Sequence, residues 1–242
     1  MKIEAVASSK TTISCISCNA RKFCWPQNIS DFETARVNRT VHLRKSIKKG
    51  TSLINVGMAF HSIYVIRSGF FKTSISTGNG QEHLLGFQMM GDSLGMDGFA
   101  SHKHNSDVNA LEDSDICVIP THEIENLSRV SPIFQRHFFQ LLSQEIVRDN
   151  QKLLMLSQMS ADVRLAKFIQ NLTQRLHARG FSKSEVLLRM SRQEIGQYLG
   201  LKLETVSRTF SKFSELGMLE INRRHLRILN FDAIESLVGS NC

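Results

Sequence analysis

Cysteine residues near the N-terminus have the spacing of a metal-binding site. Cys15, Cys18 and Cys24 form the pattern C-x2-C-x5-C, and two thiolates three residues apart can bind one metal centre through a tight turn. Two further cysteines, Cys117 and Cys242, lie far along the chain. A thioredoxin-type redox pair is not favoured, because no βαβ pattern surrounds the first two cysteines. The spacing therefore favours metal chemistry.

Spacing alone leaves the occupant of this cysteine cluster open. Zinc would fit, with Cys117 or His42 as the fourth ligand, and the thiols could also be without a ligand. Arg21 and Lys22 lie between the second and third cysteines. We expect their positive charges to offset thiolate charge and to lower the pKa values of the thiols.

A second set of residues has the types and spacing needed to read DNA. In MSRQEIGQYLGLKLETVSRTFSKFSELGML, Ser191 and Glu194 form a capping box, which predicts a helix to about Tyr198. Gly200 supplies a turn, and a second helix is expected over residues 203–216. A helix, a short glycine turn and a second helix together form a helix-turn-helix motif.

The second of these helices is expected to enter the DNA groove. Glutamate accepts from cytosine N4 and arginine donates to guanine, whereas lysine is better suited to phosphate. Because an acidic residue weakens attraction to phosphate, Glu204 makes sense mainly as a base reader. Arg223 and Arg224 form the tip of a predicted hairpin, which would be a wing that contacts phosphates. The candidate DNA-binding residues are Lys202, Glu204, Thr205, Ser207, Arg208, Lys212, Arg223 and Arg224.

A heptad pattern predicts that a long helix pairs with a second copy of itself. Ser131 and Pro132 mark its start, as a capping serine followed by proline at the first helical position. The alternative is a helix packed on its own barrel. The candidate dimer-interface residues, spaced 3, 4, 3, 4 and 3, are Phe139, Leu142, Ile146, Asp149, Leu153 and Leu156.

Asp149 interrupts this apolar seam. In a parallel dimer two copies of its carboxylate would face each other and repel, and burying them unpaired is costly. We therefore hypothesise a marginal dimer that needs help from another event, such as ligand or cluster binding. In the alternative, Asp149 lies just off the seam and pairs with Arg148 or Lys152 of the partner copy.

Composition limits the function classes. The chain has 242 residues and a formal net charge of +8, and residues 158–242 hold 13 Lys and Arg against 8 Asp and Glu. That local excess agrees with an anion-binding C-terminal part. No run approaches the roughly 20 apolar residues of a membrane span, and the N-terminus has no apolar signal segment, so we expect a cytoplasmic protein. Nucleophile triads, phosphate loops and HExxH motifs are absent from the sequence, which argues against an enzyme.

Short β segments punctuated by glycine occupy about residues 40–120, which predicts a β-barrel or sandwich. Gly78-Asn79-Gly80 is a strong hairpin turn. A short helix is expected over 31–39, and another is expected to be N-capped by Thr121. The predicted strands cover residues 41–43, 52–55, 62–67, 70–76, 82–89 and 116–119.

The order of barrel, long helix and winged helix-turn-helix resembles the cyclic-AMP receptor protein superfamily. The N-terminal cysteine pattern, Cys117 in DICVIP, and ETVSR in the second helix resemble its FNR branch, the oxygen-sensing fumarate and nitrate reduction regulators. The motifs FIQNL and EIGQYLGL add support, and the resemblance extends from about Cys15 to Leu229.

The resemblance implies an α+β fold, in which a jelly-roll-like β-barrel of the cyclic-nucleotide-binding type is joined by a long dimerisation helix to a winged helix-turn-helix. The implied parts are a cysteine-rich segment (1–30), a sensor barrel (31–130), the dimerisation helix (131–158) and the DNA-binding domain (159–242). It also implies a 4Fe–4S cluster, whose ligands would be Cys15, Cys18, Cys24 and Cys117.

The implied function is a global transcription regulator that binds DNA as a homodimer under anaerobic conditions. Glu204, Ser207 and Arg208 would read a palindrome resembling TTGAT-N4-ATCAA, Asp149 matches the acidic seam residue of the branch, and the turn at Gly78–Gly80 resembles a surface that contacts RNA polymerase. The alternatives are a zinc- or thiol-based redox regulator and a small-molecule-gated regulator of the same superfamily.

One part of the chain departs from the cyclic-AMP-binding members of the superfamily, and one cysteine is not an expected cluster ligand. The stretch 96–110 lacks the Arg-Ser pair and the acidic residue that hold cyclic AMP in nucleotide-binding members, so cyclic AMP is not expected as the effector. Cys242, at the C-terminus, is expected to be a spare thiol.

Overall fold

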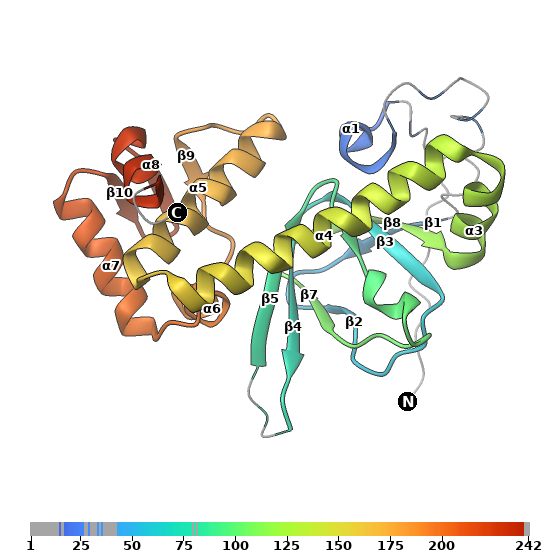
Figure 1. The fold of residues 1–242 in the computed structure, drawn as a ribbon, viewed down its shortest axis with the longest axis horizontal. Helices are drawn as coiled ribbons and strands as arrows, with labels where there is room; N and C mark the ends of the chain where they lie inside the picture. Colours follow the sequence, from blue (N-terminus) through green and yellow to red (C-terminus); the bar gives the residue numbers. More distant parts are fainter. Residues whose placement is uncertain are drawn as a thin grey trace. The chain divides into compact units, whose positions relative to one another are not determined.

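The structure is a computed structural model that describes residues 15, 17–26, 29, 33, 35, 43–78, 80 and 82–239 (Figure 1). Contacts divide the chain into two units. The first comprises residues up to Ser76 together with Leu85–Gln144, and the second comprises Thr77–Leu84 and the chain from Glu145 onwards. His42, Asn79, Cys242 and most of the helix expected over 31–39 lie outside the described residues.

The first unit contains two four-stranded sheets of a jelly-roll-like domain, which are open rather than closed into a barrel. Their strand orders are β1-β8-β3-β6 and β2-β7-β4-β5. The prediction of a β-rich domain over this region is confirmed, although β6 and β7 were not predicted. The strands are β1 (Leu43–Ile47), β2 (Ser52–Ile54), β3 (Ser62–Ser68), β4 (Phe70–Ser76), β5 (Glu82–Met89), β6 (Ser93–Leu94), β7 (Asp107–Ala110) and β8 (Ser114–Pro120).

Apolar side chains of both sheets form the core of this domain. Ile66 of β3, Phe71 of β4 and Ile116 of β8 belong to one buried cluster and are fully enclosed. Strand β8 pairs with β1 on one side and with β3 on the other, which places Cys117 opposite Arg44 of β1 and opposite Val65 of β3. This register fixes the surroundings of Cys117.

Two helices follow the sheets, α3 (Thr121–Val130) and the long α4 (Pro132–Gln158). Ser131 caps α4 as predicted, because its Oγ accepts from the Phe134 amide at 3.3 Å. The prediction that Thr121 caps α3 is wrong, since Thr121 is the first helical residue and Pro120 occupies the cap position. The reason is that β8 runs directly into the helix, and the Thr121 hydroxyl instead donates to the His61 carbonyl at 3.4 Å.

The second unit carries helices around a small three-stranded sheet of order β10-β11-β9. The amphipathic helix α5 supplies much of its core, including fully buried Leu165 and Ile169. No helix within the described ranges is long and apolar enough to cross a membrane. The elements are α5 (Ala161–Ala178), β9 (Glu185–Leu187), α6 (Arg192–Leu199), α7 (Leu203–Glu215), β10 (Leu219–Asn222), β11 (His225–Ile228) and α8 (Phe231–Gly239).

One arginine joins the end of α4 to the helices that follow it. The Arg164 guanidinium donates to the carbonyls of Leu156 at 2.7 Å and Leu199 at 3.0 Å, and its Nε donates to that of Met159 at 2.8 Å. These bonds satisfy carbonyls at helix ends that have no partner within their own helix. The C-terminal end of α4 is thereby fixed to the first helix of the helix-turn-helix.

Candidate cofactor pocket and nucleic-acid interface

Four cysteine side chains from distant parts of the sequence line one pocket in the first unit. Cys15, Cys18 and Cys24 come from the segment around the short helix α1 (Arg21–Cys24), and Cys117 comes from β8. The pocket comprises about 370 Å³ of space, part of it open to solvent. The structure therefore brings together the four cysteines that the family resemblance selected, and none of these four forms a disulfide.

These thiols interact electrostatically with one another. Burial, followed by the charges of Cys117 and Cys18, raises the pKa of Cys15 to about 11. Burial also raises the pKa of Cys24 well above its ordinary value, and the other three thiols raise it further. The pKa of Cys117 is raised mainly by burial. Because four adjacent thiolates repel, full ionisation would need a cationic centre among them, as metal binding supplies.

The expectation that Arg21 and Lys22 lower the thiol pKa values is wrong for Cys15, Cys24 and Cys117, whose pKa values are all raised. The physical reason is that docking on the barrel buries these thiols, and burial outweighs the nearby positive charges. The charges that oppose the shift at Cys117 come from strand residues Arg44 and Arg67, which the sequence did not reveal as part of the site.

The cysteine segment is docked on the β-rich domain and on α4. Trp25 is only 5% exposed, and its ring centroid lies 5.6 Å from that of Phe134 in α4. His137, one turn further along α4, has its Nε2 3.3 Å from the Cys24 carbonyl oxygen. On the barrel side, a Cβ added at Gly91 would lie 2.4 Å from Phe23 Cβ, so only glycine permits this approach.

Four cysteine thiols around one pocket are a donor set that suits an iron–sulfur cluster. No group of three or more His, Cys, Asp or Glu side chains in the described part of the chain is arranged to hold a metal ion. An iron–sulfur cluster separates its thiolates more widely than one ion does, because irons and sulfides lie between them. Within the described part of the chain, the Nε atom of Arg44 is buried beside the thiols without a hydrogen-bond partner, so an anionic occupant would satisfy it.

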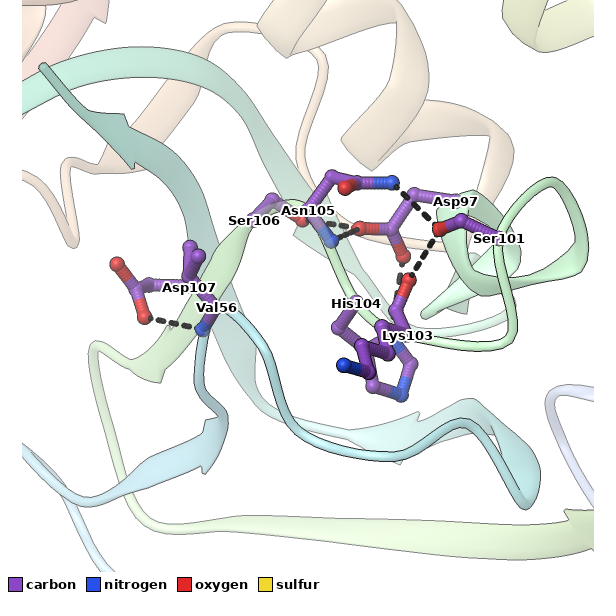
Figure 2. Close-up of polar contacts among 8 residues, drawn as sticks. All are labelled: Val56, Asp97, Ser101, Lys103, His104, Asn105, Ser106 and Asp107. Carbon is purple, nitrogen blue, oxygen red and sulfur yellow. Dashed lines mark hydrogen bonds and ion pairs between the residues drawn. The ribbon is translucent and has the colours of Figure 1, made fainter.

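The loop that precedes β7 is held together by its own side chains. Figure 2 shows the Asp97 carboxylate accepting from the backbone N–H of Asn105 at 2.7 Å and from the Ser106 hydroxyl at 3.0 Å. His104 Nδ1 lies 3.1 Å from the other carboxylate oxygen, and its ring is fully buried. Asp107 accepts from the Val56 amide at 2.9 Å. This loop, in residues 96–110, thus owes its form to internal bonds, and His104 is an interior barrel residue.

The helix-turn-helix forms as the sequence predicted. Glu194 N donates to Ser191 Oγ at 3.1 Å, and Ser191 N donates to the Glu194 carboxylate at 2.7 Å, which completes the capping box. Gly200 adopts a left-handed conformation with φ of 62°. A Cβ added at Gly196 would lie 2.7 Å from the Leu201 carbonyl oxygen, so glycine allows the tight turn between α6 and α7.

Helix α7 has one buried face and one exposed face. Val206, Phe210 and Phe213 are buried in the core of the domain. The exposed residues on the other side include Glu204, Ser207 and Arg208, whereas Thr205 is half-buried. Exposed Lys202 stands at the N-cap of this helix. Ser211 is also exposed and was not among the candidate residues.

The wing is a hairpin of β10 and β11 in which Asn222 pairs with His225. Arg223 and Arg224 form its exposed tip, and Arg223 has a φ of 54°. The small sheet that contains this hairpin has a third strand, β9, which was not predicted from the sequence. Lys212 forms an ion pair with Asp162 of α5, so its ammonium group is already engaged within the domain.

The heptad positions on α4 separate into two rows. Phe139, Ile146 and Leu153 are 60%, 62% and 65% exposed, which is unusual for large apolar side chains. In the other row Asp149 is exposed, while Leu142 and Leu156 are half-buried. Leu156 Cδ2 would lie 3.4 Å from a Cβ added at Gly200, so this residue faces the chain's own helix-turn-helix.

The architecture defines a class of protein: a β-rich sensor-type domain continued by a long helix and a winged helix-turn-helix is typical of DNA-binding transcription regulators. The cyclic nucleotide-binding domain family matches residues 44–130, and the Crp-like helix-turn-helix domain family matches residues 163–237. The structure of FixK2 from Bradyrhizobium japonicum has a TM-score of 0.74 at 23% identity, covering 80% of this chain and 96% of that chain, so the fold is shared.

Two curated relatives match nearly the whole chain. The transcriptional regulatory protein btr of Bordetella pertussis is 38% identical over 234 residues, with 97% of each chain covered. The fumarate and nitrate reduction regulatory protein of Escherichia coli K12 is 37% identical over 237 residues, which covers 98% of this chain and 95% of the relative. The chain belongs to the Crp/Fnr family of transcription regulators and is not an enzyme.

Proposed function

We propose that this regulator senses oxygen through a 4Fe–4S cluster and binds DNA as a homodimer when oxygen is absent. Four cysteines would hold the cluster: Cys15, Cys18, Cys24 and Cys117. The observation that carries the proposal is that these four thiols line one pocket and each interacts electrostatically with the others. Similarity to a fumarate and nitrate reduction regulatory protein supports the same reading.

When bound, the cluster would supply an oxygen-labile link between the N-terminal segment and β8. The chain's own residues would carry the effect of that link to α4. Trp25 packs on Phe134, and the Cys24 carbonyl lies beside His137, so the position of the cysteine segment bears directly on the first turns of α4. Loss of the link would release these contacts.

Helix α4 is proposed as the dimerisation helix. Burying Phe139, Ile146 and Leu153 against a second copy would stabilise the dimer by roughly 1.5–3 kcal/mol for each side chain. Asp149 opposes this, because two facing carboxylates repel by about 1 kcal/mol even in a water-like environment. Leu142 and Leu156 would contribute less, since both are half-buried in the single chain. Because apolar burial and the Asp149 repulsion oppose each other, cluster binding would be able to shift the balance between monomer and dimer.

Helix α7 is proposed to read each half of a palindrome resembling TTGAT-N4-ATCAA. Glu204, Ser207 and Arg208 are exposed on one face and have suitable base-reading chemistry. A dimer would place its two α7 helices about 34 Å apart, one turn of DNA. The residues proposed for phosphate contact are Lys202, Thr205, Lys212, Arg223 and Arg224, of which Lys212 would first have to leave Asp162.

The remaining parts of the proposal rest on the family resemblance. The hairpin turn that includes Gly78 and Gly80 is proposed to contact RNA polymerase. The protein would act in the cytoplasm, and cyclic AMP would not be its effector. The proposed parts remain 1–30, 31–130, 131–158 and 159–242.

The test is an anaerobic purification followed by absorption spectroscopy, iron and sulfide analysis, and a DNA-binding assay. We expect a brown protein with about four irons and four sulfides per chain, which binds the palindrome tightly. Exposure to air should bleach the colour and weaken binding in parallel, whereas a scrambled half-site should bind weakly under both conditions. A colourless protein that contains zinc, or DNA binding that is indifferent to air, would refute the proposal.

A further inference from the structure

The described lining of the cysteine pocket contains positive charge and no carboxylate. Its described lining includes Arg21, Arg44 and Arg67, and no Asp or Glu. Arg44 lies on β1 directly opposite Cys117, and Arg67 lies at an irregularity of β3, where the register with β8 shifts between Ile66 and Ser68. The sheet therefore positions two guanidinium groups beside the four thiols.

The Arg44 side chain is only partly satisfied in this pocket. One of its N–H groups donates to the Cys117 thiol, which lowers the pKa of that thiol against the larger effect of burial. Its Nε is buried and has no hydrogen-bond partner among the residues that the structure describes. A buried donor without a partner lowers stability, so the site favours an additional acceptor. The charge of the arginine also acts on Cys15, on the other side of the pocket.

We propose that Arg44 is a positioning residue of the cluster, whose Nε–H donates to one of the cluster sulfurs beside Cys117. The inference rests on the proposed function, because it requires a cluster in this pocket. Four thiolates around a 4Fe–4S core leave roughly two negative charges to be balanced, and hydrogen bonds to sulfur tune such clusters. Arg44 and Arg67 carry charge of the sign that such a cluster needs.

This role has a predictable electrochemical consequence. A positive charge and a hydrogen bond both stabilise the more reduced, more negative cluster, so they raise its reduction potential. Replacing Arg44 by Gln should shift the potential downwards. Arg44→Lys keeps the charge but lacks the fixed planar donor, so its shift should be in the same direction and smaller. The cluster should also be lost several-fold faster from Arg44→Gln during anaerobic treatment with an iron chelator.

A purely structural role for Arg44 predicts a different pattern. If the arginine mainly stabilised the sheet, its replacement would lower the melting temperature of the apo-protein. In our proposal the apo-protein carries an unsatisfied buried donor, so Arg44→Met should leave its melting temperature unchanged or raise it. The same variant should bind the cluster less well. Opposite effects on the apo- and cluster-bound forms would separate the two roles.

The experiment compares wild type, Arg44→Gln, Arg44→Lys, Arg44→Met and the control Lys45→Gln. Lys45 is the next residue on the same strand and is exposed, so its replacement removes the same charge outside the pocket. Each protein is reconstituted anaerobically with iron and sulfide. The measurements are iron content, visible spectrum, midpoint potential by spectroelectrochemistry, and melting of the apo-protein.

We expect the control to match wild type and the Arg44 variants to differ in potential and in cluster retention. If Arg44→Gln and Lys45→Gln have the same potential and lose iron at the same rate, the role of Arg44 is refuted while the cluster itself stands. If wild type takes up no cluster, the proposed function and this inference both fall. A lower melting temperature of apo Arg44→Met would assign the residue to the sheet instead.

Discussion

The cysteine pocket and the helix-turn-helix are built in opposite ways. The helix-turn-helix depends on residues that are close in the sequence, since its capping box spans Ser191 to Glu194 and its turn joins Gly196 to Leu201. The pocket depends on strand register, because Cys117 and Arg44 meet only through the pairing of β1 with β8. Local construction makes a rigid reading unit, whereas construction from distant segments makes a site that can be dismantled.

The largest expected effect is the loss of tight anaerobic DNA binding while the DNA-binding domain stays folded. Cys117→Ser removes the only one of the four thiols that belongs to the barrel, so the cluster should not be retained. Anaerobic binding to the palindrome should fall to the level of air-treated wild type. Far-UV circular dichroism should stay unchanged, because the helix-turn-helix folds through its own local contacts.

Cys242→Ser is the matched control for that variant, since it removes a thiol from the C-terminus. It should keep the brown colour, the iron content and tight anaerobic binding. Retention of a full cluster by Cys117→Ser, or its loss from Cys242→Ser, would contradict the assignment of the ligands.

The next largest expected effect concerns DNA reading by the helix-turn-helix. Arg208 is exposed on α7. Removing its side chain, as in Arg208→Ala, should weaken binding to the palindrome about 10- to 100-fold, because a bidentate contact to guanine contributes roughly 1–3 kcal/mol. Arg208→Lys should not restore selectivity for that base, because lysine lacks the planar fork. Iron content should match wild type.

Ser211→Ala serves as the control for Arg208, because Ser211 is an exposed residue of the same helix. Fluorescence anisotropy with the palindrome and with single-base variants measures both affinity and specificity. Equal loss of affinity for every sequence would assign Arg208 to phosphate contact rather than base reading.

The same difference explains what could be predicted from the sequence. Capping residues, turn glycines and heptads act over a few residues, so α4, α6, α7 and the wing were predicted nearly to their ends. Strand β7 was missed because its segment reads as a polar loop. The four cysteines were selected by a family pattern, but Arg44, Arg67, Trp25 and His137 were not, since only the folded sheet and helix bring them to the thiols.

The third expected effect concerns Asp149 in the proposed dimer seam of α4. Asp149→Asn removes the charge at the seam and keeps the shape of the side chain. Because two facing carboxylates repel by about 1 kcal/mol or more, the dimer of the apo-protein should become at least about fivefold more stable. Sedimentation equilibrium in air would measure this directly.

Asn150→Ala is the control for Asp149, because it alters an exposed neighbour on the same helix without changing charge. Its dimer constant should equal that of wild type. An unchanged monomer–dimer balance in Asp149→Asn would show that this residue does not weaken the seam.

The smallest expected effect concerns Lys152, which lies on α4 and contacts elements of the second unit. Its Nζ donates to the Leu84 carbonyl at 2.7 Å and lies 4.5 Å from the centroid of the Tyr198 ring in α6. Burial lowers the pKa of Lys152 to about 8, and the charge of Asp149 opposes this shift only in part. Below that pH the folded protein carries a partly buried charge, so this residue reduces stability at neutral pH.

The sign of the pH dependence follows from that lowered pKa. Since the pKa of Lys152 is about 8 in the folded protein and 10.5 in its ordinary state, the unfolded chain binds more protons between these values, and stability rises with pH across this window. Lys152→Met should therefore be more stable than wild type at pH 7, with a gap that closes towards pH 10.5. Urea unfolding of the apo-protein at several pH values measures this gap. The control Lys183→Met alters an exposed lysine beside the Phe231 ring and should show no such trend. If the stability difference between Lys152→Met and wild type stays constant with pH, burial does not destabilise the Lys152 ammonium.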